Sequence, residues 1–438
     1  MMRIVSASIR ERAFRSFLLG DALTLIAMSV GQVALPWWIT LENGVHDLAL
    51  YSIVSAGVAC LAVPAMATLA DRSDKRALLR AGLAAYSFSS MLVALLAGSG
   101  RYDIRLLLAL DVIGTAGLSL ATPVASVIAT EILPPETIAR GLQKQRFWQS
   151  AGQLTGPLIG GGALAWGGVT LALWAQFVMS TISLALLWRI PAANYAAPSG
   201  VAGRPWLEDL TAGLRAKWRI ALERNWTLIS FLVGIFLVPS MGMLLPLKVR
   251  SLGLAGEWLG ICEAAIALGL LAGAAAGMSA RLIRRVGRYR LRFVAATLLG
   301  PLLALAGCSS RPLVLTVALA GAGVMNSIVV MMGYSRRILA TPANFRTRMI
   351  AVNMTLTHLA ALAGPALAAI LLVRLSVAEI YSVFGFCLLF CSVGYALTPD
   401  FRTFLSLPDA QVEGWYEGRY PEAFKRVLNR AISTRRVM

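Results

Sequence analysis

The sequence predicts an all-α membrane protein with twelve transmembrane helices in two pseudo-symmetric six-helix bundles. Of its 438 residues 58% are hydrophobic and only 14% are charged, which is too little polar surface for a soluble protein. Stretches such as 48–70 and 226–247 are long enough, at about 1.5 Å per residue, to cross a hydrocarbon core of about 30 Å. These stretches are continuously apolar and do not alternate, which excludes a β-barrel.

Twelve such stretches follow one another along the chain. The predicted spans are 14–40, 47–70, 77–98, 104–130, 137–166, 169–189, 226–249, 256–279, 291–309, 312–335, 346–373 and 376–397. Residues 1–15 carry four arginines and no cleavage pattern, which predicts an uncleaved cytoplasmic end. The five cysteines are an odd number within or beside apolar spans, so we expect them to pack as side chains and not to form disulfides.

The positive charge is distributed unevenly across the membrane. A net charge of +19 would indicate nucleic acid as the partner of a soluble protein, but six of the 40 Lys and Arg residues lie on one side of the predicted spans and 34 on the other. The six are Arg101, Arg105, Lys248, Arg250, Arg311 and Arg374. The positive-inside rule then places both termini in the cytoplasm, and anionic membrane lipid becomes the expected partner of this charge.

The longest interruption divides the chain into two halves. We predict an N-terminal bundle at 1–190, a cytoplasmic linker at 191–225, a C-terminal bundle at 226–398 and a cytoplasmic amphipathic tail at 399–438. The linker is rich in Pro and Gly and ends in a charged helical stretch. The tail mixes aromatic and basic residues, which favours a helix on the inner leaflet, with a docking surface for a cytoplasmic partner as the alternative.

An internal repeat relates the halves. At a fixed offset of 208 residues, four pairs match in the same topological position: Pro134 with Pro342, Arg140 with Arg348, Gly156 with Gly364, and Pro157 with Pro365. Small residues also recur at four-residue spacing, which puts them on one helical face. These stripes are Gly152, Gly156 and Gly160, then Gly269, Gly273 and Gly277, then Ala360, Gly364 and Ala368. They predict either tight static packing or a smooth surface on which one half rocks against the other.

Two motifs resemble the major facilitator superfamily, over nearly the whole chain. The segment 69–76 is similar to its signature loop after the second span, with Ala67 and Asp74 replacing two glycines of the usual form. The segment 152–161, Gly-Gln-Leu-Thr-Gly-Pro-Leu-Ile-Gly-Gly, resembles a motif of exporting members, with Gln143 in place of a further upstream glycine. The resemblance implies a conformational gate made of Asp71, Arg72, Arg76, Gly152, Gly156, Pro157, Gly160 and Gly161, with Asp71 facing residues 344–348.

Shorter matches at 14–20 and 33–37 resemble a subgroup that includes macrolide efflux proteins and the enterobactin exporter. This resemblance implies a monomeric bacterial inner-membrane transporter. It would export a small organic solute such as a drug or siderophore by alternating access, in exchange for protons. The alternatives are uptake of a metabolite or lysophospholipid, and a transport-inactive sensor or scaffold. No Walker loop, zinc-ligand spacing or nucleophile elbow occurs in the sequence, so we expect neither an enzyme, a cofactor nor a metal site.

Ionisable groups within spans are costly and therefore mark candidate coupling sites. They are Asp21, Asp111, Glu263 and His358. Asp21 and Glu263 are the preferred proton carriers. Asp111 could instead neutralise the charge of Arg105, and His358 could instead be a hydrogen-bonded histidine of the core. Candidates for the substrate cavity are polar or aromatic: Gln32, Gln149, Gln153, Asn326, Asn353, Phe147, Trp148, Trp226 and Tyr334. Each also has the simpler interpretation of helix packing.

Overall fold

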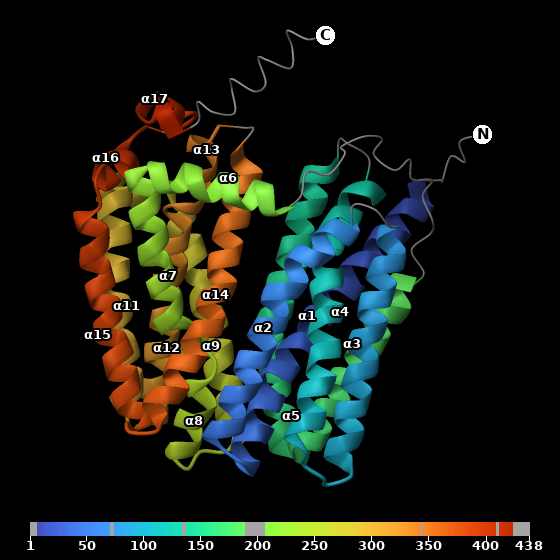
Figure 1. The fold of residues 1–438 in the computed structure, drawn as a ribbon. Helices are drawn as coiled ribbons and strands as arrows, with labels where there is room; N and C mark the ends of the chain where they lie inside the picture. Colours follow the sequence, from blue (N-terminus) through green and yellow to red (C-terminus); the bar gives the residue numbers. More distant parts are fainter. Residues whose placement is uncertain are drawn as a thin grey trace. The chain divides into compact units, whose positions relative to one another are not determined.

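The computed structural model describes residues 7–70, 74–133, 137–188, 206–342, 345–408 and 411–423, and its regular structure there is helical (Figure 1). The helices of the first half are α1 (Ala7–Glu42), α2 (Val45–Ala70), α3 (Lys75–Gly98), α4 (Ile104–Ile132) and α5 (Ile138–Trp188). Those that follow are α6 (Trp206–Arg219), α7 (Ala221–Met241), α8 (Leu244–Ser251), α9 (Gly256–Met278), α10 (Ala280–Val286), α11 (Arg288–Cys308), α12 (Pro312–Met331), α13 (Tyr334–Ala340), α14 (Arg346–Leu372), α15 (Val377–Leu397), α16 (Phe401–Ser406) and α17 (Trp415–Arg419), followed by a 3₁₀ turn at Pro421–Ala423.

The predicted twelve-span helical fold is confirmed. In the part of the chain that the structure describes, eleven helical segments are long and apolar enough to cross a membrane. One of them, Gly141–Trp188, is 48 residues long and provides two crossings. The break falls at Gly167 and Gly168, where Gly168 has a φ of 65°, a left-handed conformation that glycine adopts without steric cost. This is the position at which the sequence predicts the fifth span to end and the sixth to begin.

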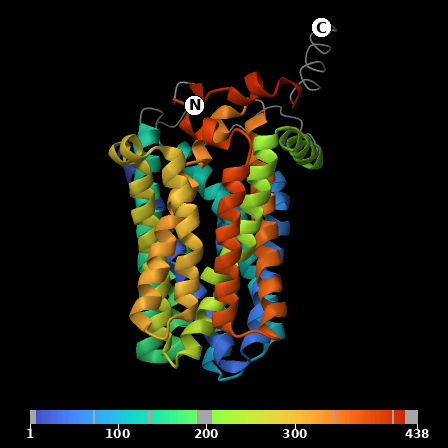
Figure 2. The same ribbon diagram turned by 90° about the vertical axis from the view of Figure 1, so that its left-hand side faces the viewer.

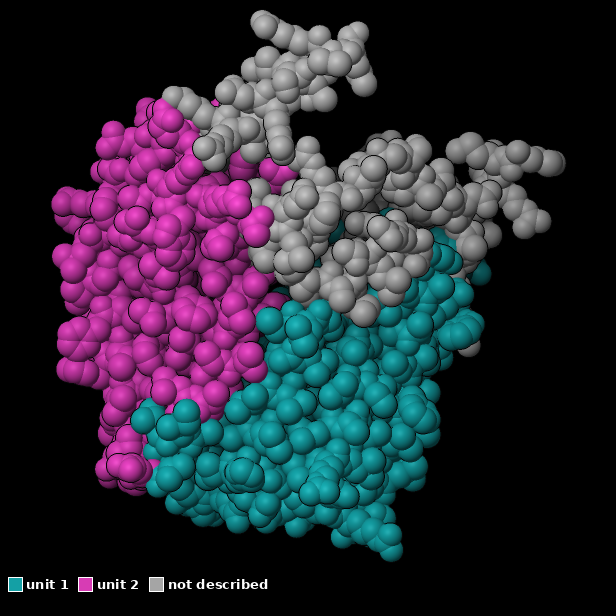
Figure 3. Space-filling view, viewed as in Figure 1, with its two compact units in different colours: residues 1–201, 242–267, 368–373 teal, residues 202–241, 268–367, 374–438 magenta. Residues whose placement is uncertain are grey.

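The chain forms two compact units, coloured separately in Figure 3. Unit 1 comprises residues 1–201, 242–267 and 368–373, and unit 2 comprises residues 202–241, 268–367 and 374–438. Helix α8 and the first half of α9 therefore group with the N-terminal helices by their contacts. The four-part division at 190, 225 and 398 remains a prediction.

In unit 1 the glycine stripe of α5 packs against α1. A side chain at Gly156 would place its Cβ 2.5 Å from the Cβ of Ser29, and one at Gly160 would lie 3.3 Å from the Cα of Val30. Further along α5, a Cβ at Gly161 would approach Gly260 of α9 to 2.9 Å. Small residues thus let these helices approach closely, as their spacing predicts.

The same arrangement recurs in unit 2. A Cβ at Gly364 of α14 would lie 2.6 Å from the carbonyl oxygen of Ile235 on α7, and a Cβ at Gly273 of α9 would meet Val324 and Ser327 of α12. Gly156 and Gly364 are a pair of the 208-residue repeat, and each packs its helix against the first long helix of its own half. The contacts of Gly156, Gly160, Gly273 and Gly364 therefore lie inside single units.

One end of unit 2 carries additional short elements. Figures 1 and 2 place α6, α16 and α17 at the same end of its long helices. There Phe404 and Tyr416 are fully buried, and the Arg292 guanidinium lies 4.5 Å from the Trp226 ring centroid. The Arg336 guanidinium donates to the Leu405 carbonyl oxygen at 2.8 Å. The described part of the predicted tail is therefore integrated into the core of unit 2, while residues 424–438 lie outside the described part.

Candidate functional site

Unit 1 holds a buried carboxylate between α1 and α5. Asp21 is 9% exposed, and its Oδ2 accepts hydrogen bonds from the amide nitrogens of Gln145 at 3.0 Å and Gln149 at 2.9 Å. The two glutamines are four residues apart and so share the face of α5 that packs on α1. The predicted coupling residue Asp21 and the predicted cavity residue Gln149 therefore form one cluster.

The Asp21 cluster contains one acid and two neutral amides. No Lys or Arg among the described side chains forms an ion pair with Asp21, and its Oδ1 has no hydrogen-bond partner there. Arg146 lies nearby and donates to the Gln149 amide oxygen at 3.4 Å. An unpaired buried charge is costly, so such a carboxylate is suited to taking up and releasing a proton.

The other three predicted coupling residues lie apart from this cluster. Asp111 on α4 accepts hydrogen bonds from Ser55 and Tyr51 of α2, so hydroxyl groups, not Arg105, are its described partners. Glu263 on α9 and His358 on α14 are half-buried, and neither side chain has a hydrogen bond or ion pair with a described residue.

The predicted cavity residues do not gather at one place. Gln32, Gln153, Phe147 and Trp148 are exposed, and Asn326 is half-buried. Trp226 is a buried core residue of unit 2 that lies under two guanidinium groups. Asn353 and Tyr334, however, line one pocket in unit 2.

The predicted gate is described only in part. Asp71 and Arg72 lie outside the described residues. Arg76 is buried at the start of α3. Its backbone N–H donates to the carboxylate of Asp74 at 3.0 Å, so the Asp74 side chain caps the helix. Gly152, Gly156 and Gly160 face α1, and Gly161 approaches α9 next to Pro157.

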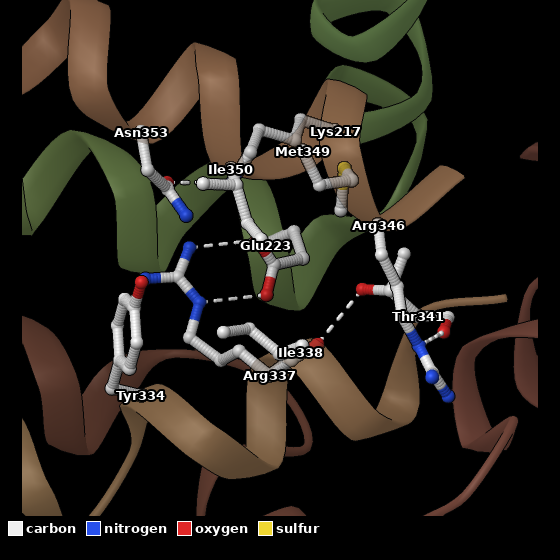
Figure 4. Close-up of a pocket in the computed structure, with 10 residues that line it drawn as sticks. All are labelled: Lys217, Glu223, Tyr334, Arg337, Ile338, Thr341, Arg346, Met349, Ile350 and Asn353. Atoms are coloured by element: carbon white, nitrogen blue, oxygen red, sulfur yellow. Dashed lines mark hydrogen bonds and ion pairs between the residues drawn. The ribbon is translucent and has the colours of Figure 1, made fainter. Parts of the chain in front are cut away.

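The unit 2 pocket adjoins a network of charged side chains that the sequence did not single out (Figure 4). Glu223 at the start of α7 is 1% exposed and accepts from Arg337 of α13 at 2.8 and 2.7 Å and from Lys217 of α6 at 2.8 Å. Tyr416 of α17 donates to the same carboxylate at 2.5 Å. Lys217 also donates to the Asn353 amide oxygen at 2.8 Å.

Burial controls the ionisation of the network residues outside the spans. It lowers the pKa of the Lys217 ammonium to about 8, although the Glu223 carboxylate opposes that shift. Burial also raises the pKa of the Tyr416 phenol well above its usual value, and the negative charge of Glu223 adds to this effect. Tyr416 is therefore a neutral donor at physiological pH.

Sequence reasoning missed Gln145, Lys217, Glu223, Arg337 and Tyr416. Gln145 had a signal, because it precedes Gln149 by one helical turn. The other four come from separate elements, α6, α7, α13 and α17, and no local pattern connects them.

The sequence profile of the Major Facilitator Superfamily matches residues 17–334. The chain belongs to this superfamily. It is therefore a multi-pass membrane transporter of a small molecule and not an enzyme. No curated protein sequence matches the chain.

Solved structures of other transporters share the fold of this superfamily member. A mutant of the nucleoside transporter NupG has a TM-score of 0.72 at 12% identity, covering 88% of this chain and 100% of its own. The peptide transporter POT bound to alafosfalin has a TM-score of 0.70 at 14% identity, covering 90% and 95%. A bacterial homologue of the human lysosomal transporter Spinster has a TM-score of 0.63 at 14% identity, covering 93% and 99%. Identities this low show a common fold alone.

Proposed function

We propose that this transporter exports a small organic solute by alternating access, in exchange for protons that bind Asp21. The observation that carries the proposal is the Asp21 cluster, a buried carboxylate that accepts from two neutral amides and forms no ion pair with a described side chain. Protonation would remove the charge from this buried position, and release would restore it. Coupling requires that the two steps occur in different conformations.

Export is the direction favoured by the segment 152–161, which resembles the motif of exporting members. Pro157 lacks a backbone donor, and the glycines beside it bring α5 against α1 and α9. We assign the conformational gate to Gly152, Gly156, Pro157, Gly160 and Gly161 of α5 together with Asp71, Arg72 and Arg76. The resemblance to macrolide and enterobactin exporters makes drugs and siderophores the proposed substrates.

A second intramembrane acid, Glu263, lies on α9. Glu263 is the second proposed proton carrier, because its half-buried carboxylate has no described polar partner.

The resemblance and the distribution of positive charge also place the chain, which we propose to be a monomer in a bacterial inner membrane with both termini in the cytoplasm. Reporter fusions after Arg224 and at the C-terminus should both give a cytoplasmic signal. A periplasmic signal at either point would overturn this orientation.

Coupling is tested in everted vesicles with an imposed proton gradient. Erythromycin, enterobactin and ethidium are added in turn, and proton release is followed with a pH-sensitive dye. We expect wild-type protein to exchange protons for at least one of these solutes and Asp21→Asn to abolish the exchange. Glu263→Gln is measured in parallel.

The matched control is Asp47→Asn. Asp47 is also a buried unit 1 acid, which accepts from Asn43 at 3.0 Å and Tyr102 at 2.8 Å, but it lies at the start of α2. The Asp47→Asn variant should exchange protons for solute at the wild-type ratio. The proposal is wrong if the double variant Asp21→Asn/Glu263→Gln also keeps the wild-type ratio of protons to solute. Solute-driven proton movement in the opposite sense would instead favour uptake, and an inert wild-type protein would favour a sensor or scaffold.

A further inference from the structure

The unit 2 pocket presents hydrogen-bond donors that no described group uses. It is lined by residues of α6, α7, α13 and α14. The Asn353 amide oxygen accepts from Lys217, which turns the amide nitrogen away from the ammonium. Figure 4 shows that nitrogen, the Arg337 guanidinium and the Tyr334 hydroxyl on the same side of the network. Neither the Asn353 Nδ2 nor the Tyr334 Oη has a hydrogen-bond partner among the described residues.

Arg337 contributes a third donor. Its Nε and Nη2 both bond to Glu223, and Nη2 also reaches the Thr227 hydroxyl at 3.0 Å. The guanidinium lies 4.7 Å from the Trp226 ring centroid, so its plane is fixed from two directions. This geometry leaves Nη1 for a further partner.

The charge around the pocket is positive. Lys217 and Glu223 are each 1% exposed and Arg337 is 13% exposed, so one buried and one largely buried cation face a single buried acid. Arg346 adds a cation at the rim, where its nearest described acid is the exposed Glu413 at 3.7 Å. A buried excess charge is costly unless it is compensated, and an anion would compensate it.

Lys217 contributes positive charge to the pocket but has no N–H left to donate to a ligand. Its three protons are used by Glu223, by Asn353 and, at 3.2 Å, by the Thr227 hydroxyl. The ammonium therefore positions Asn353 and contributes its field. Asn353, Arg337 and Tyr334 are the groups that would contact a ligand.

We infer that this pocket binds the oxyanion of a phosphate or carboxylate group, held by the Asn353 amide, the Arg337 guanidinium and the Tyr334 hydroxyl. The ionised oxygens of a phosphate or carboxylate group accept hydrogen bonds and carry negative charge, which matches three donors in a positive site. A cation would meet like charge, and a neutral polar solute would leave the excess charge uncompensated. The oxyanion belongs either to a soluble anion or to a lipid headgroup, and the site does not depend on the proposed export or its coupling.

The test uses the full chain in nanodiscs of zwitterionic lipid. Inorganic phosphate is titrated at constant ionic strength with chloride as the balancing anion, and the rise of the unfolding temperature gives an apparent Kd. We expect wild-type protein to be stabilised by phosphate. Tyr334→Phe removes one donor from a half-exposed side chain and should weaken binding about tenfold. Asn353→Asp places a carboxylate beside the anion and should abolish the response.

The matched control for Asn353→Asp is Asn225→Asp. It makes the same isosteric change near the start of α7, where Asn225 bonds to the neighbouring Arg224 and does not line the pocket. Its phosphate response should equal that of wild type. The inference is overturned if wild-type protein does not respond to phosphate in zwitterionic nanodiscs, or if Asn353→Asp responds as strongly as Asn225→Asp.

A second set of nanodiscs contains phosphatidic acid and separates the two sources of the oxyanion. If a lipid headgroup occupies the pocket, these discs should stabilise wild-type protein and weaken its response to phosphate, and Asn353→Asp should lose that stabilisation. If the ligand is a soluble anion, the phosphate titration should be the same in both kinds of disc. Either result supports the site, and both are measured without transport.

Discussion

Gln145 in unit 1 and Asn353 in unit 2 occupy equivalent positions of the repeat, because they are separated by its offset of 208 residues. Their side chains nevertheless bind groups of opposite charge. Gln145 donates its amide N–H to the lone acid Asp21, whereas Asn353 offers its amide oxygen to the cation Lys217. In both halves a glycine of the repeat approaches the first long helix closely, Gly156 on α1 and Gly364 on α7. The two halves therefore share their close helix contacts but differ in the charged groups between those helices.

The difference between the clusters has a physical meaning. In unit 2 the acid Glu223 is held by two cations and a phenol, so losing its charge would unbalance the network. In unit 1 the hydrogen-bond partners of Asp21 are neutral amides, so protonation of the acid breaks no described ion pair. One frame thus supports a structural ion cluster in one unit and a group suited to proton exchange in the other.

The largest effect is expected from Glu223→Gln. It leaves Lys217 and Arg337 buried without an acid and should destabilise the protein by about 3–5 kcal/mol. Thermal unfolding in detergent measures the loss. A loss no greater than that of Asp21→Asn would mean that the two clusters do not differ as described.

A second comparison tests whether the helical frames are equivalent. Gly156→Leu and Gly364→Leu each force a side chain against the first long helix of their own half, where a Cβ alone would lie 2.5 Å from Ser29 and 2.6 Å from Ile235. We expect each to cost about 1–3 kcal/mol and to reduce transport more than membrane insertion. Gly162→Leu is the control, because a Cβ there meets nothing within 4 Å. Unequal losses for the two stripe variants would show that the frames differ in tightness.

The pH dependence of stability isolates Lys217. Its pKa is about 8 in the folded protein against the ordinary 10.5, so between these values the unfolded chain holds a proton that the folded protein has released. Stability from this group is therefore reduced below pH 8 and increases as the pH rises, by at most about 2 kcal/mol between pH 8 and 9.5. Lys217→Met should remove that increase, and Lys144→Met, at an exposed position of α5, should keep it. An equal increase in both variants would contradict the assignment.

The smallest effect on stability is expected from Asp21→Asn. The asparagine oxygen can accept the hydrogen bonds of both Gln145 and Gln149, and no described cation is left unpaired. We expect a change of less than about 1 kcal/mol in unfolding free energy. A loss comparable to that of Glu223→Gln would reveal that Asp21 serves structure before coupling.

The helical membrane class, the spans and the internal repeat can all be recognised from the amino-acid sequence. Spans follow from hydrophobic length, because only a helix satisfies its own backbone in lipid. The boundary between the fifth and sixth spans was predicted between residues 166 and 169, and the close helix pairs were predicted from the four-residue spacing of small residues. These properties are local or periodic, so they can be read along one chain.

The pairing of the charged side chains, in contrast, became visible in the folded protein. Asp21 and Gln145 are 124 residues apart, and Tyr416 lies 193 residues from Glu223. Whether a buried acid is balanced by cations or by neutral amides depends on side chains that folding brings together from separate helices. The strength of a charge interaction depends on distance and burial in space, and neither is encoded by position along the chain.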